Sequence, residues 1–176
     1  METIIAIIVF IALFILIYTI YNNKFQFVII EIEEAENNVE DLLHKKFDLL
    51  QRTIPIINKE LKLDDFLEKI EHLDLNKISH FELNDLLRES YNTLLVTVDE
   101  NDKLNKSEPL KEILDDLENL EIELSGAIKF YNDGVTKFNK LVATFPANIV
   151  SLLRGYKKKE FYSNEKKEMF EILNEE

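Results

Sequence analysis

An uncharged apolar stretch at residues 4–21, IIAIIVFIALFILIYTIY, is the feature that most constrains how this chain can fold. As a helix it would be about 27 Å long, close to the thickness of the hydrocarbon core of a bilayer. Tyr18 and Tyr21 lie at one end of the stretch, where aromatic rings prefer the membrane interface. The sequence therefore predicts a single-pass membrane protein whose transmembrane anchor occupies residues 1–23.

A cleaved signal peptide is the alternative interpretation of the same stretch. Against it, the apolar run is long, no Lys or Arg precedes it, and no small-residue cleavage motif follows it. Lys24 is the first cation after the run, and the positive-inside rule then favours a cytoplasmic location for the following residues. We expect an anchor in the cell membrane, with residues 24–176 as one domain in the cytoplasm.

The composition of the whole chain favours helices over strands. Three Gly and three Pro are few for a fold with many tight turns, whereas Leu, Ile, Glu and Lys are abundant. The absence of Cys excludes disulfides, thiolate metal sites and a cysteine nucleophile. The net charge of −13 repels nucleic acid, so we expect no nucleic-acid partner.

Apolar residues recur every three or four positions along three long segments, which is the period of an amphipathic helix. The first segment runs to about Leu61, and Pro55 should kink this helix or end it near Ile54. Ser79 and Glu82 form a capping box that opens the second helix, which reaches about Glu100. A third helix starts after Ser107, and its apolar stripe continues without a miss to Phe145, where Pro146 ends it.

Shorter helices are predicted around these three. Asp64 and Asp65 should cap one that reaches about His72, residues 148–154 should form one or two turns, and Ser163 should cap a last helix. Helices with one apolar stripe must pack on each other. We expect an all-α fold, an up-and-down antiparallel bundle of three to four long helices that run alternately away from and towards the membrane.

Residues 104–161 resemble the LemA family, whose members are small bacterial and archaeal membrane proteins. The family pattern is roughly E-x9-Y-N-x5-Y-N-x5-F-P-x-N, followed by an aromatic-rich Gly segment. Here it is carried, without gaps, by Glu121, Tyr131, Asn132, Phe138, Asn139, Phe145, Pro146, Asn148, Gly155 and Phe161. The basic-aromatic stretch at residues 45–49 also fits, whereas Glu123 and Ile128 stand where the family usually has Arg. The resemblance implies an N-terminal transmembrane helix, a helical-bundle domain and no catalytic residues.

Glu121 is a charged residue on an otherwise apolar stripe. One hypothesis pairs its carboxylate with a cation on the first long helix, either Lys45 or Lys46, so that the pair fixes helix register. The alternative is that the drift of the stripe turns Leu120 inward and leaves Glu121 at the edge.

Asn132 and Asn139 are seven residues apart and follow the rings of Tyr131 and Phe138, so they share one helix face. Their amides are predicted to hydrogen-bond to the backbone of a neighbouring connection and to position it. The alternative is that both are surface amides.

A basic segment follows the third helix and is the possible partner patch of the chain: Arg154, Tyr156, Lys157, Lys158 and Lys159. It would dock an acidic partner or a phosphate-bearing surface, and the alternative is a solvated loop. The predicted helix directions place it at the bundle end away from the membrane, where the protein's own bilayer would be a poor partner.

No motif for catalysis, metal binding or cofactor binding emerges from the sequence. The three His lack metal-ligand spacing, and there is no Gly-rich phosphate loop and no nucleophile elbow. We therefore expect a non-enzymatic interaction or scaffold module that binds other membrane proteins or copies of itself. The alternative is an accessory or regulatory subunit of a membrane enzyme, such as a membrane protease.

Overall fold

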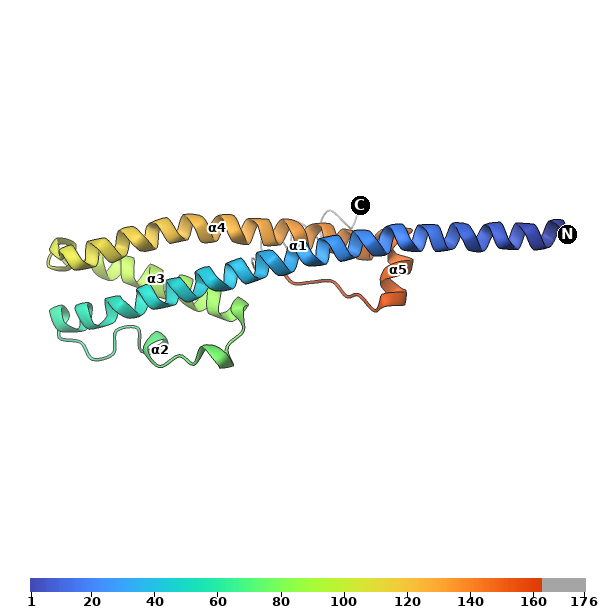
Figure 1. Cartoon of the computed structure of the whole chain (residues 1–176). Helices are drawn as coiled ribbons and strands as arrows, with labels where there is room; N and C mark the ends of the chain where they lie inside the picture. The colour runs from blue at the N-terminus through green and yellow to red at the C-terminus, as the bar shows by residue number, and fades with distance from the viewer. Residues whose placement is uncertain (163–176) are drawn as a thin grey trace. The chain divides into compact units, whose positions relative to one another are not determined.

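A computed structural model describes residues 1–162, and every secondary-structure element in that range is a helix. Figure 1 shows the elements, which are α1 (Glu2–Leu61), α2 (Glu68–Glu71), η1 (Leu75–Lys77), α3 (His80–Asp99), η2 (Leu104–Lys106), α4 (Glu108–Ala143) and α5 (Ala147–Arg154). The predicted all-α fold class is confirmed for these residues. The helix predicted after Ser163 lies outside the described residues.

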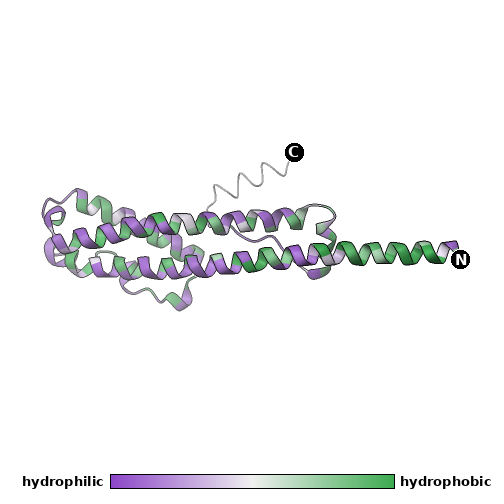
Figure 2. Cartoon of the chain, turned by 45° about the horizontal axis from the view of Figure 1, so that its top comes forward, coloured by the Kyte–Doolittle hydropathy of each residue, from purple (hydrophilic) through white to green (hydrophobic). Residues whose placement is uncertain are grey.

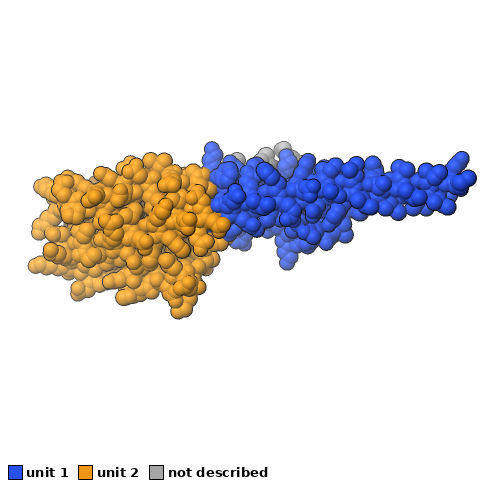
Figure 3. Space-filling view, viewed as in Figure 1, with its two compact units in different colours: residues 1–36, 129–176 blue, residues 37–128 orange. Residues whose placement is uncertain are grey.

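The chain divides into two compact units (Figure 3). Unit 1 contains residues 1–36 and the chain from residue 129 onward, and unit 2 contains residues 37–128. Because α1 and α4 are long, each contributes one part to either unit.

The N-terminal part of α1 carries the apolar stretch, which Figure 2 shows as a continuous run of hydrophobic residues. Residues 1–16 are all exposed, and α1 is the one helix in the described range long and apolar enough to cross a membrane. So large an apolar surface is rare on a soluble monomer. By length and composition this segment could span a bilayer.

In unit 2, residues 37–61 of α1, helix α3 and the first part of α4 pack around an aliphatic core that includes Leu50, Leu87 and Leu117. Figure 1 shows that α3 runs in the same direction as this part of α1 and that α4 runs in the opposite direction. The expectation that the second long helix would run back towards the anchor is wrong. Instead, residues 62–79 bring the chain back from the end of α1 to the start of α3. They can do so because an extended chain of that length reaches further than the length of the 20-residue α3.

The returning connection is held by its own buried side chains. Phe66 and Ile70 are buried, and the side-chain amide of Gln51 donates to the carbonyl oxygen of Ile70 over 3.3 Å. Helix α2 is a single turn that begins after Leu67, so the caps predicted at Asp64 and Asp65 are wrong.

The ends of the long helices follow the local signals, with one exception. The capping box between Ser79 and Glu82 is confirmed, with both reciprocal bonds in place at the start of α3. The exception is the end predicted near Ile54, because α1 continues past Pro55 to Leu61. Ile57 lies beyond the proline and is fully buried, and burial of such a side chain offsets much of the roughly 3 kcal/mol that an interior proline costs.

In unit 1, the last part of α4 runs antiparallel to the first part of α1. The contacts define this direction, because Lys137 pairs with Glu31 whereas Phe138, further along α4, meets Phe25, which is earlier in α1. Gly155, with φ of 70°, ends α5 in the left-handed conformation. The basic segment therefore lies at the same end of unit 1 as the apolar stretch, and its predicted position far from the membrane is wrong.

Candidate functional site

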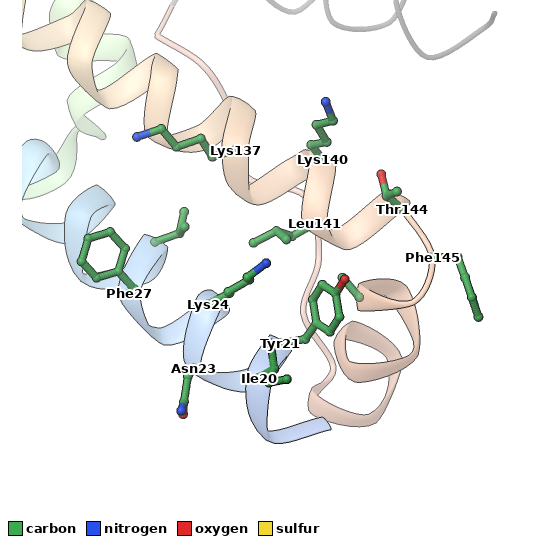
Figure 4. A pocket seen from close by; sticks show the side chains of 12 residues that line it. Ile20, Tyr21, Asn23, Lys24, Phe27, Lys137, Lys140, Leu141, Thr144 and Phe145 are labelled. Carbon is green, nitrogen blue, oxygen red and sulfur yellow. The ribbon is translucent and has the colours of Figure 1, made fainter. Parts of the chain in front are cut away.

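A groove in unit 1 is the candidate site of the protein (Figure 4). It has a volume of about 790 Å³ and lies between α1 and α4 where the apolar stretch ends. Its lining combines apolar side chains with three lysines: Ile20, Tyr21, Asn23, Lys24, Phe27, Val28, Lys137, Lys140, Leu141, Thr144, Phe145 and Ala147. In Figure 4, Lys24 and Leu141 point into the space between the two helices.

The groove exposes a large apolar side chain beyond the end of the apolar stretch. Phe27 is 71% exposed, although Val28 beside it is buried in the core. The core stripe of α1 runs through Val28 and Ile32, so Phe27 lies off that stripe. A large apolar ring in this position is exposed and adds little to the core of unit 1.

The three lysines of the groove differ in their surroundings. The ammonium of Lys137 lies 2.6 Å from the carboxylate of Glu31. That of Lys24 lies 5.1 Å from the centroid of the Tyr21 ring, a cation–π arrangement. Within residues 1–162, Lys24 and Lys140 have no carboxylate within ion-pair distance, so they leave positive charge at the groove.

An aromatic cluster supports this end of unit 1. The ring centroid of Phe25 lies 5.6 Å from that of Phe138 and 4.9 Å from that of Tyr156. The side-chain amide of Gln26 donates to the Tyr156 hydroxyl over 2.9 Å. The cluster thus ties residue 156, after α5, to both long helices.

The two asparagines of the family pattern bond to the backbone that follows α5. Asn139 donates to the carbonyl oxygen of Lys159 over 2.9 Å and accepts from its N–H over 2.8 Å. Asn132 accepts from the N–H of Tyr162 over 3.1 Å. Both asparagines are 2% exposed, so the amides are interior rather than surface groups.

Tyr131 reinforces the same connection. Its hydroxyl donates to the carbonyl oxygen of Glu160 over 3.2 Å, and its ring packs edge-on against that of Tyr162. Burial first, and then the nearby carboxylates of Glu36 and Glu160, raise the pKa of Tyr131 well above its usual range. The hydroxyl therefore stays protonated and available as a donor.

The five residues of the predicted patch have different surroundings. Arg154, Lys157 and Lys158 have exposed side chains. Tyr156 is half-buried in the aromatic cluster, and Lys159 is held through its backbone. The structure therefore groups the first three as surface cations and the other two as parts of the fold.

Phe145 and Pro146 do not continue the core stripe of α4. That helix ends at Ala143, and Phe145 is 75% exposed, so its predicted place on the bundle seam is wrong. Pro146 is half-buried and precedes the first residue of α5. The chain turns here, which takes the Phe145 ring out of the stripe.

In unit 2, the carboxylate of Glu121 contacts the ammonium of Lys46, whereas Lys45 is exposed. The side chain of Lys46 is 1% exposed and that of Glu121 is 32% exposed. Burial lowers the pKa of Lys46, and the hydrogen bond and charge of Glu121 oppose that effect. Leu120 is also buried, as the alternative interpretation expected. Burial of Leu120 and the ion pair of Glu121 therefore occur together.

The Lys46 ammonium also lies 5.3 Å from the centroid of the Tyr91 ring on α3. The pair therefore joins three helices of unit 2. Among residues 1–162 no group of three or more His, Cys, Asp or Glu side chains is placed to hold a metal ion.

Neither the groove nor Phe27 was predicted from the sequence. A signal was present, because Phe27 and Ile30 are large apolar residues just beyond the apolar stretch and off the core stripe, and both are exposed. The sequence does not predict which lysines lie beside them, because Lys137 and Lys140 are more than a hundred positions away along the chain.

The helical bundle, the apolar N-terminal helix and the groove beside its end together define a helical-bundle protein with a candidate membrane anchor. The LemA family model matches residues 35–172, which is more than half of the chain, and the protein belongs to the LemA family. The resemblance seen in the sequence is thereby confirmed. No curated protein matches the chain.

Proposed function

We propose that this protein is anchored in the cell membrane by residues 4–21 and serves as a non-enzymatic module that binds other membrane proteins. Its bundle faces the cytoplasm, and the groove between α1 and α4 is the binding site. One observation carries the proposal: the groove begins at Ile20 and Tyr21, the last residues of the apolar stretch, and continues along α1 past Phe27.

The position of the groove selects the kind of partner. A protein that crosses the same bilayer beside residues 4–21 brings the helical extension of its own transmembrane segment to the groove. Phe27 and Leu141 offer apolar contacts to such a helix, and Lys24 offers a cation. The partner is therefore a membrane protein whose helix carries apolar residues and at least one acidic residue directly after its span.

Site-specific photocrosslinking in the native membrane tests this proposal. A photoreactive amino acid replaces Phe27 in unit 1, and the matched control replaces Ile122 in unit 2, since these side chains are 71% and 70% exposed. Position 27 should give an adduct that maps next to the transmembrane segment of another membrane protein, close to an acidic residue. Lys24→Glu should weaken that adduct several-fold and leave position 122 unaffected.

Other results would overturn the proposal. Equal adducts at positions 27 and 122 would indicate non-specific contact, and adducts with lipid alone would remove the protein partner. Adducts only between copies of this chain would instead indicate a self-associating scaffold. If the captured partner is a membrane enzyme whose rate changes when Lys24 is replaced, the protein is an accessory subunit of that enzyme.

A further inference from the structure

Helix α5 presents an apolar face that no other described residue of unit 1 covers. Leu152 is 83% exposed, Leu153 61% and Ile149 39%, and Phe145 just before the helix is 75% exposed. Ile149, Leu152 and Leu153 are separated by three and one positions, so they belong to one face of the helix. The opposite side of α5 is buried through Ala147, Val150 and Ser151.

The position of α5 identifies what meets this face. The helix and the turn before it lie against the apolar stretch of α1, where Phe14, Ile17 and Tyr18 share an apolar cavity with Ile149 and Val150. Figure 1 shows α5 running crosswise to α1. Phe14 lies about 10 Å and Tyr18 about 5 Å before Tyr21 along the axis of α1. If Tyr21 marks the membrane surface, these distances equal the depth at which an interfacial helix lies.

The charges next to α5 suit an anionic lipid surface. Arg154 ends the helix, and the exposed side chains of Lys157 and Lys158 follow it before the first acid, Glu160. An apolar helix face next to a cluster of cations is the pattern of a helix that lies in the membrane plane. This cluster stands out because the chain as a whole carries a net charge of −13.

From these observations we infer that α5 and Phe145 lie in the interfacial layer of the leaflet that α1 enters, with Leu152 and Leu153 among the acyl chains. Arg154 and Lys157 then contact anionic headgroups of the same leaflet. The inference rests on the membrane anchor of the proposed function. A bilayer that surrounds residues 10–18 must also meet α5, which lies beside them, so lipid is the occupant that the geometry selects.

The second attachment changes what the anchor does. A single helix leaves the attached bundle free to swing and rotate at the membrane surface. With α5 in the interface, unit 1 is held at two places, and the groove of Phe27 and Lys24 is kept at a constant height above the bilayer. A partner in the same membrane then meets a groove in a defined orientation.

The absence of Cys from the chain allows a direct test with single-cysteine variants of the full-length protein. Leu152→Cys probes α5, Ala12→Cys probes the apolar stretch, and Ile122→Cys is an exposed control in unit 2. Each variant is labelled with an environment-sensitive fluorophore and reconstituted in vesicles of phosphatidylcholine with phosphatidylglycerol. Quenchers attached to lipids at a shallow or a deep position then report the depth of each label.

We expect the label at Leu152 to be quenched at least about twofold more by the shallow quencher than the label at Ile122. Arg154→Glu with Lys157→Glu, or vesicles without phosphatidylglycerol, should reduce that quenching. A Leu152 label that behaves like the Ile122 label, while the Ala12 label is quenched by the deep quencher, would overturn the inference and leave the anchor intact. An Ala12 label without quenching would overturn both.

Discussion

Replacing Glu121 by alanine removes the carboxylate that contacts the ammonium of Lys46 in unit 2. The lysine side chain is 1% exposed, so the variant leaves a buried cation without its partner. Breaking a buried ion pair from one side typically costs about 3–5 kcal/mol. Because Glu121 is itself 32% exposed, water can enter where its side chain was, and we expect the smaller cost of about 1–3 kcal/mol.

The opposite replacement should behave differently. Lys46→Met puts an apolar chain of similar length into the core, and the half-exposed Glu121 that remains can be hydrated. We therefore expect Lys46→Met to be neutral or stabilising, by up to about 2 kcal/mol. The two variants should differ in stability because Lys46 is more deeply buried than Glu121, and not because of the strength of their contact.

Urea unfolding and thermal unfolding of the full-length protein in mild detergent, both followed by circular dichroism, measure these differences. A loss of about 2 kcal/mol should lower Tm by about 4–8 °C in a chain of this size. The double variant should be more stable than Glu121→Ala alone, since it contains no unpaired buried charge. The reasoning is refuted if Lys46→Met costs more than Glu121→Ala, or if Glu121→Leu melts higher than the parent with unchanged helicity.

Burial lowers the pKa of Lys46 in the folded protein, so as pH rises the unfolded chain keeps this proton to a higher pH than the folded protein does. The unfolding free energy should therefore rise with pH up to about 10.5. Lys46→Met should lack this increase. Asn139→Ala loses two hydrogen bonds to the backbone after α5 and should cost about 1–3 kcal/mol and speed proteolysis there, whereas the exposed control Asn119→Ala should change neither. Gly134→Ala brings a Cβ to 2.9 Å from a buried isoleucine of α1, so thermal unfolding should show a loss of about 1–3 kcal/mol in protein stability. In the control Gly126→Ala the added Cβ meets nothing within 4 Å, and the protein should become more stable by about 0.5–1 kcal/mol. A reporter enzyme fused after the last residue should be active in the cytoplasm, and activity on the other side of the membrane would reverse the proposed orientation.

Features that depend on neighbouring residues were readable from the sequence. The apolar stretch at residues 4–21, the capping box at Ser79 and the short helix that ends at Arg154 all lie where the local pattern predicted them, and the left-handed Gly155 directly follows that helix. Each depends on an interaction within a few residues, namely a run of apolar side chains, an i to i+3 hydrogen bond or one backbone angle. Membership of the LemA family was also readable, because the motif spacing is itself local.

Contacts between distant residues were decided by the tertiary structure alone. The direction of α3 depends on the path of residues 62–79, and the choice of Lys46 over Lys45 depends on the rotation of α1 against α4. The groove joins Lys24 to Leu141, and α5 meets the apolar stretch after α4 has brought the chain back. Periodicity predicts which face of a helix is apolar. It carries no information about which other helix covers that face, because packing between residues far apart in the sequence decides this.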